Sequence, residues 1–107
     1  MAKAKKTETI RICPYDLPVC PVDPDDPRLS EGAHGSDGTF VPAPCPHIIV
    51  RNDVTGLFSG SIRLHEAIEA IGELHGLGLR EYQVVGLEVG LLRFIRDNPQ
   101  LIKDLQA

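Results

Sequence analysis

The chain has 107 residues, which is the size of one domain and leaves little room for a second. Hydrophobic residues make up 42% of it, enough to build one core, and this argues against a chain that is disordered throughout. The formal net charge is −4, only 5% of the residues are aromatic, and tryptophan is absent. Nucleic-acid binding needs a basic surface and stacking side chains, so we expect no nucleic-acid partner.

The N-terminal segment "MAKAKK" is basic, and we interpret residues 1–6 as a flexible tail. No apolar segment follows it, as a secretion signal would require, and no apolar run reaches the ~18 residues of a membrane span. The chain has three cysteines, an odd number that cannot pair completely, which favours a reducing compartment. We therefore predict a soluble, cytoplasmic protein that does not enter membranes.

The first half of the chain is rich in proline. Ile10 and Ile12 alternate with polar neighbours over residues 7–13, which predicts a short, half-buried strand. Eight of the nine prolines then fall within residues 14–46. Each proline removes a backbone donor and disfavours helix at the preceding residue, so we predict a long Pro-rich loop here. Because such long loops are uncommon in compact domains, we expect a metal ion or a partner protein to order it.

Residues 47–60 indicate a second strand region. The segment "HIIVR", residues 47–51, has the composition of a strand, and residues 52–56 have the Asn, Asp and Gly typical of a turn. We predict a short return of the chain through residues 57–58.

Two helices are predicted after this region. The first begins at Ser61 and ends at Gly76, and its apolar positions recur at helical spacing: Leu64, Ala67, Ile68, Ile71 and Leu74. The second covers residues 80–98 and ends at Pro99, which is well placed to begin a last helical turn. The valines and glycines of residues 82–92 leave a strand as the alternative there.

These elements together predict an α+β fold. It has two or three short strands, a long Pro-rich loop and a C-terminal antiparallel helical hairpin, because the linker "GLGL" between the helices is short. Residues 7–107 form one domain, in which residues 7–60 supply the strands and the loop, and residues 61–107 supply the hairpin with its C-terminal turn.

The second helix is apolar on more than one side, so it needs more than one partner surface. One interpretation is a central helix buried within this chain. The other is a surface for self-association or for a protein partner, with a flat groove at the two glycines. The residues we assign to this interface are Val84, Gly86, Leu87, Gly90, Leu91 and Phe94.

Three Cys-Pro pairs raise the question of a metal site. Cys13, Cys20, Cys45 and His47 supply the Cys3His donor set of a tetrahedral zinc site, which would fasten both ends of the 14–46 loop. The seven-position gap between the first two cysteines is wider than in zinc knuckles, however. A disulfide joining Cys20 to Cys13 or to Cys45 and ordinary buried thiols remain open alternatives.

The segment "HEAIE", residues 65–69, nearly matches the HExxH helix of zinc proteases, but its fifth residue is Glu instead of His. His65 and Glu69 share one helix face, and Glu66 and Glu73 share another. We interpret these residues as the solvated side of an amphipathic helix, with a carboxylate-bridged metal or an acid–base dyad as the alternative.

Three functions are compatible with these patterns. The first is a small adaptor or regulatory protein that acts through protein–protein contact. The second is a structural subunit of a larger homo- or hetero-oligomeric assembly. The third is a small metal- or thiol-dependent enzyme or carrier that uses the three cysteines. No nucleophile motif or phosphate-binding glycine motif points to a particular reaction, so the sequence favours binding over catalysis.

Overall fold

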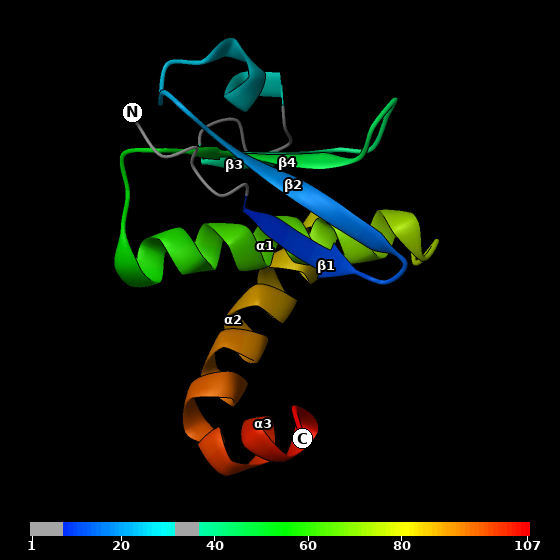
Figure 1. The fold of residues 1–107 in the computed structure, drawn as a ribbon, viewed down its shortest axis with the longest axis vertical. Helices are drawn as coiled ribbons and strands as arrows, with labels where there is room; N and C mark the ends of the chain where they lie inside the picture. The colour runs from blue at the N-terminus through cyan, green and yellow to red at the C-terminus, as the bar shows by residue number, and fades with distance from the viewer. Residues whose placement is uncertain (1–7, 32–36) are drawn as a thin grey trace, which may run out of the picture.

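The computed structural model describes residues 8–31 and 37–107 and confirms the α+β class. Within these residues a four-stranded mixed sheet has the order β1-β2-β4-β3, with β2 and β4 parallel and the other pairs antiparallel (Figure 1). The predicted tail, residues 1–6, lies outside the described residues. The elements are β1 (Thr9–Ile12), β2 (Tyr15–Val22), the 3-10 helix η1 (Pro27–Glu31), β3 (Gly38–Val41), β4 (His47–Arg51), α1 (Gly56–Leu74), α2 (Glu81–Asp97) and α3 (Pro99–Leu105).

The prediction of an unbroken loop over residues 14–46 is wrong, because this segment contains β2, η1 and β3. Strand β2 accommodates its two prolines by position. The Val19 amide donates to the Glu8 carbonyl at 2.9 Å, and alternate amides of a strand point to opposite edges. Pro21 therefore faces the β1 side beyond the end of the β1 ladder, and Pro18 faces the β4 side before the β4 ladder begins. Neither position needs an amide hydrogen.

The sheet is covered on both faces. One face packs against α1 through a cluster of buried apolar residues: Ile12, Leu17, Val19, Ile48, Val50, Ile62 and Ala70. Ile49 points to the opposite face, where η1 lies over β3 and β4 and contributes the fully buried Leu29. The alternation of buried side chains along β4 therefore separates two small cores, as expected for a strand with both faces covered.

Helix α1 begins five residues earlier than predicted, at Gly56, so the expected strand return at residues 57–58 is its first turn. It ends at Leu74, before Gly76, as the sequence indicates. Helix α2 confirms the helical prediction and excludes the strand alternative for residues 82–92. Pro99 begins α3, also as predicted.

The structure does not confirm the antiparallel helical hairpin. Only the first part of α2 lies against α1, and the rest runs away from the sheet and carries α3 to the far end of the molecule (Figure 1). The predicted interface residue Val84 is 3% exposed, so it belongs to the interior of this chain and not to a free surface. Leu87, Leu91 and Phe94 are exposed, and added Cβ atoms at the two glycines of α2 would meet open space.

No helix in the described part of the chain has the length and apolar character needed to cross a membrane.

Candidate metal centre

A histidine and four glutamates meet where α1 crosses α2. His65 and Glu69 are one helical turn apart on α1, so their side chains lie on the same face. Glu81 and Glu88 are two turns apart on α2 and face the same point from the other helix. Glu66, next to His65, adds the fifth group. The spacing on each helix is local, but their meeting depends on the crossing of α1 and α2.

The two ring nitrogens of His65 face different carboxylates. Nε2 lies 3.3 Å from Oε1 of Glu69 and 3.5 Å from Oε1 of Glu81. Nδ1 lies 3.3 Å from Oε1 of Glu88, to which it can donate a hydrogen bond. The side chain of His65 is only 12% exposed, so these contacts fix the ring between the two helices.

Glu66 is the most deeply buried member of the cluster, with 4% of its surface exposed. Its Oε1 atom has no hydrogen-bond partner among the described residues. Burial, followed by the nearby carboxylates of Glu69, Glu81 and Glu88, raises the pKa of Glu66 to about 9. A charged carboxylate at such depth is costly, because removal from water disfavours its charged form. A group of this kind is a common mark of a functional site.

Strand β3 comes unusually close to the cluster. A Cβ atom on Gly38 would lie 3.0 Å from Cγ2 of Ile62 and 3.1 Å from Cγ of Glu66, so a larger residue would require these side chains to shift by a few tenths of an ångström. Gly72 plays a similar part at the other end of α1, where an added Cβ would lie 2.9 Å from Cδ1 of Leu79. The first contact brings the sheet edge to the cluster, and the second holds the turn that leads into α2.

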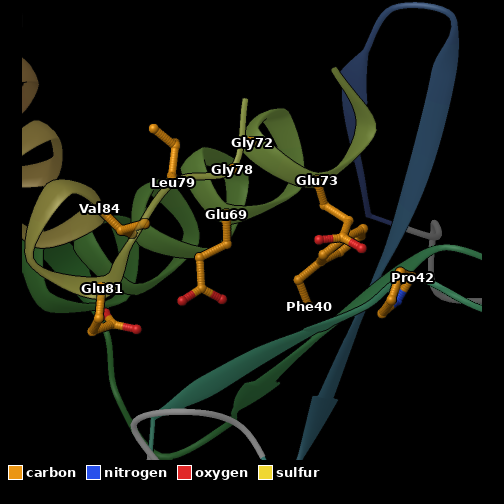
Figure 2. A pocket seen from close by; sticks show the side chains of 9 residues that line it. All are labelled: Phe40, Pro42, Glu69, Gly72, Glu73, Gly78, Leu79, Glu81 and Val84. Carbon is orange, nitrogen blue, oxygen red and sulfur yellow. The ribbon is translucent and has the colours of Figure 1, made fainter. Parts of the chain in front are cut away.

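Two hollows flank the cluster along β3. One, of about 250 Å³, is bounded by Phe40 and Pro42 on the sheet side, and the side chains of Glu69 and Glu81 point into it (Figure 2). The other, of about 360 Å³, lies at the start of β3 and is lined by residues of α1 and α2 that include His65, Glu66 and Glu88. The cluster therefore divides a depression that follows β3.

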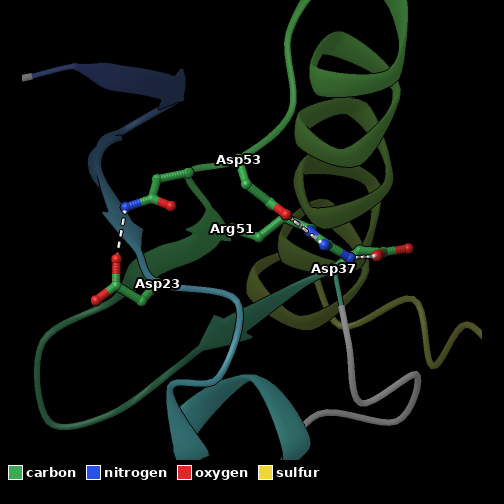
Figure 3. A network of polar contacts seen from close by, with 5 residues as sticks. Asp23, Asp37, Arg51 and Asp53 are labelled. Atoms are coloured by element: carbon green, nitrogen blue, oxygen red, sulfur yellow. Dashed lines mark hydrogen bonds and ion pairs between the residues drawn. The ribbon is translucent and has the colours of Figure 1, made fainter.

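An arginine network fixes the start of β3 (Figure 3). Arg51, the last residue of β4, pairs with Asp53 at 2.6 and 2.7 Å and with Asp37 at 3.1 Å. Hydrogen bonding to Arg51 holds the pKa of Asp53 below its usual value. Asn52 donates to Asp23 at 3.1 Å, which joins the ends of β2 and β4. The network holds Asp37 beside the second hollow.

His65 Nε2 faces a carboxylate on each helix, Glu69 on α1 and Glu81 on α2. Ligands at about 2.0–2.2 Å from a shared ion lie roughly 3.3–3.5 Å apart when the angles between them are about 100–120°. The two separations measured from Nε2, 3.3 and 3.5 Å, fall in that range, whereas Glu69 and Glu81 do not share a group of ligand atoms within 4.8 Å of one another. A metal-binding histidine usually donates its other ring N–H to a carboxylate, and Glu88 occupies that place. One imidazole carries at most one positive charge, so it cannot neutralise four carboxylates by itself.

The residues predicted as a zinc site are not brought together in this way. In the part of the chain that the structure describes, the one group of three or more potential ligands within 4.8 Å of one another is His65, Glu66 and Glu69. Cys13 lies in the β1–β2 turn, and Cys20 lies within β2 about 16 Å beyond Tyr15 at the usual rise of a strand.

All three cysteines are free, so neither proposed disulfide is present, and Cys13 and Cys45 are exposed instead of buried. His47 begins β4, and its Nδ1 lies 2.7 Å from the Cys45 carbonyl oxygen. A chemical role for the thiols stays a prediction.

The interpretation of residues 65–69 as a solvated helix face is wrong for Glu66, which β3 and α2 cover. The sequence contains one signal that could have indicated the site. Glu81 and Glu88 repeat at helical spacing on the next predicted helix. A short linker that brings the two helices together therefore also brings these carboxylates close to residues 65–69, which resemble a zinc-protease helix.

Comparison with protein-family models, with curated proteins and with solved structures found no match.

Proposed function

We propose that this protein is a metal-dependent hydrolase whose ion is held by His65, Glu69 and Glu81. The observation that carries the proposal is that His65 Nε2 contacts Glu69 and Glu81 beside Glu66, a buried carboxylate whose Oε1 has no hydrogen-bond partner among the described residues. Three protein ligands leave room for a water molecule on the ion, which is the arrangement of catalytic metal sites.

Each residue has a distinct role in the proposed reaction. An ion held there would supply Lewis-acid chemistry, and its positive charge would favour the ionised form of Glu66. Glu66 would act as the base that takes a proton from a water molecule as the water oxygen bonds to a carbonyl carbon of the substrate. The bond from that carbon to the leaving nitrogen or oxygen then breaks, and the proton held by Glu66 passes to the leaving group. Glu88 fixes the orientation of His65.

The shape of the depression favours an extended peptide as the substrate. Strand β3 pairs with β4 on one side and has no strand on its other side among the described residues. An extended chain can add to such an edge through backbone hydrogen bonds. The hollows lie on both sides of the cluster, so a chain aligned with β3 would cross the ion with residues before and after the cleaved bond.

The proposal is tested by incubating metal-loaded protein with unstructured proteins, such as reduced casein, and identifying new termini by mass spectrometry. Glu66→Gln should retain the ion and lose at least about 100-fold in cleavage rate, because it cannot accept a proton. Asp97→Asn, at the exposed end of α2 and outside both hollows, should cleave as the wild type does. Cleavage that is equal in wild type and Glu66→Gln would contradict the assigned role, and its absence in the wild type would contradict the proposed activity.

A second function, self-association, is supported by the far part of α2 and by α3. Monomeric proteins rarely expose large contiguous apolar patches. Six large apolar residues of the helical segment beyond Glu88 are each between 38% and 69% exposed: Val89, Leu91, Phe94, Ile95, Leu101 and Leu105. Gly86 and Gly90 leave open space on α2 where the backbone of a second copy can approach. We propose a second copy of this chain as the partner.

Light scattering after size-exclusion chromatography tests this second function. The wild type should have the mass of a dimer, and the double variant Leu91→Ser, Phe94→Ser should have the mass of a monomer. A wild-type monomer across micromolar concentrations would contradict self-association. The metal site contains neither residue, so the hydrolase proposal would be unaffected.

A further inference from the structure

The ligand set of the candidate centre is unusually rich in oxygen. On α1, Glu69 stands one turn after His65, where a zinc-protease helix carries its second histidine. Its Oε1 lies 3.3 Å from His65 Nε2, so it replaces that histidine in space as well as in sequence. With Glu81 at 3.5 Å from the same nitrogen, one nitrogen and two carboxylates face the proposed ion.

The chemistry of these donors bears on the choice of ion. Imidazole suits zinc, copper, iron and nickel, whereas carboxylate suits magnesium, calcium and manganese. Two ligating carboxylates also balance the double charge of the ion, and a third carboxylate, on Glu66, is buried beside them at 4% exposure. A site of one imidazole and two carboxylates should therefore discriminate less in favour of zinc than a site of two imidazoles and one carboxylate.

We propose that Glu69 is the residue that sets the metal preference of this site and shifts it from zinc toward a harder divalent ion, for which Mn²⁺ is the test case. The inference rests on the proposed function, since it concerns the same ion. The inference adds that glutamate at residue 69, where a zinc-protease helix has histidine, changes which metal ion the site prefers and does not abolish metal binding. The buried Oε1 of Glu66, which has no hydrogen-bond partner among the described residues, lies within the same group of potential ligands.

Helix α1 offers a matched control. Glu73 is the next residue along the same face and lines the same hollow as Glu69 (Figure 2). It lies outside the group of potential ligands that surrounds His65. A histidine at residue 73 therefore adds an imidazole to the same helix and hollow without changing the three atoms that face the ion.

The test is competition calorimetry with Zn²⁺ and Mn²⁺ on chelator-treated protein. The ratio of zinc to manganese affinity should rise at least about tenfold in Glu69→His, because an imidazole replaces a carboxylate, and should stay within about threefold of wild type in Glu73→His. If Glu69→His does not fold by circular dichroism, Glu81→His provides the same test with the same expected direction. An unchanged or lower ratio in the folded variant would overturn the inference while leaving the metal site intact. A wild type that binds neither ion would overturn the proposed function itself.

Discussion

Two regions of the molecule differ in which side chains they bury. One is the junction of α1, β3 and α2, and the other is the far part of α2 together with α3. At the junction, Glu66 is buried at 4% exposure, and a histidine and three further glutamates are half-buried around it. Beyond it, apolar side chains face solvent on the same helix, and Phe94 is 41% exposed. Helix α2 takes part in both regions: Val84 is buried at the junction, whereas Leu91 in the far part is 38% exposed.

We infer from this difference that the two regions need different partners: a positive charge at the junction and an apolar surface on the far part of α2 and α3. Buried carboxylates are stabilised by a positive charge, which the proposed divalent ion would supply. Exposed apolar side chains are stabilised by another apolar surface. An ion should therefore stabilise the junction without affecting association, and a partner should cover α3 without affecting the ion.

The largest expected effect is stabilisation of the junction by metal. Addition of an ion at 100 times its dissociation constant should raise the free energy of unfolding by about 2.7 kcal/mol, because only the folded chain brings both helices together. For a domain of this size the melting temperature should rise by roughly 10–20 °C. Thermal unfolding with and without a chelator measures this. His65→Ala should show no shift, and an equal shift in that variant would place the ion elsewhere.

The next effect tests the close approach of β3. Gly38→Ala places a Cβ at 3.0–3.1 Å from Ile62, Glu66 and the Ile49 carbonyl oxygen, so we expect a loss of about 2 kcal/mol in unfolding free energy. Gly60→Ala, in the open on α1, is the control and should stabilise by about 0.5–1 kcal/mol through helix propensity. Urea denaturation compares them. Equal stability of the two variants would mean that β3 does not press on α1 here.

A pair of substitutions on α2 tests the contrast directly. Val84→Ala removes buried methyl groups and should cost about 1.5 kcal/mol of monomer stability. Leu91→Ala, 38% exposed before substitution, should change monomer stability by less than about 0.5 kcal/mol and should weaken self-association. Urea denaturation at low concentration, together with sedimentation, separates the two. The reverse pattern would show that α2 packs on this chain along its far half.

The smallest effect concerns the ion pair that ties α1 to the residue before β1. Arg63 contacts Glu8 at 2.6 and 2.9 Å and lowers its pKa, chiefly through their hydrogen bond. A lowered folded-state pKa gives stability that is present above about pH 4.5 and is lost as the pH falls through the folded value. Since the pair is exposed, we expect a few tenths of a kcal/mol. Urea denaturation between pH 3 and 6 should show a shallower pH dependence for Glu8→Gln, and identical slopes would exclude the contribution.

The sequence predicted those elements whose causes are local. Strand β4 and the helices follow from apolar periodicity and from the stop signals at Gly76 and Pro99, all of which act within a few residues. Strand β2 was missed because its tolerance of Pro18 and Pro21 depends on where two neighbouring strands begin and end.

A metal at residues 65–69 was only the alternative in the sequence analysis, for a related reason. Helical spacing placed His65 and Glu69 on one face, but nothing local indicated that β3 and α2 cover Glu66. The close approach at Gly38 joins residues far apart in the chain, as does the crossing of the two helices. The three Cys-Pro pairs are conspicuous in sequence, whereas their spacing in space depends on the course of β2, which separates Cys13 from Cys20.

The most direct test of a metal centre between α1 and α2 is anomalous X-ray scattering from crystals grown with Mn²⁺. The structure predicts one strong peak per chain, at about 2.0–2.2 Å from Nε2 of His65 and from carboxylate oxygens of Glu69 and Glu81. No peak at this position, or a peak held by Cys13, Cys20, Cys45 or His47, would contradict it.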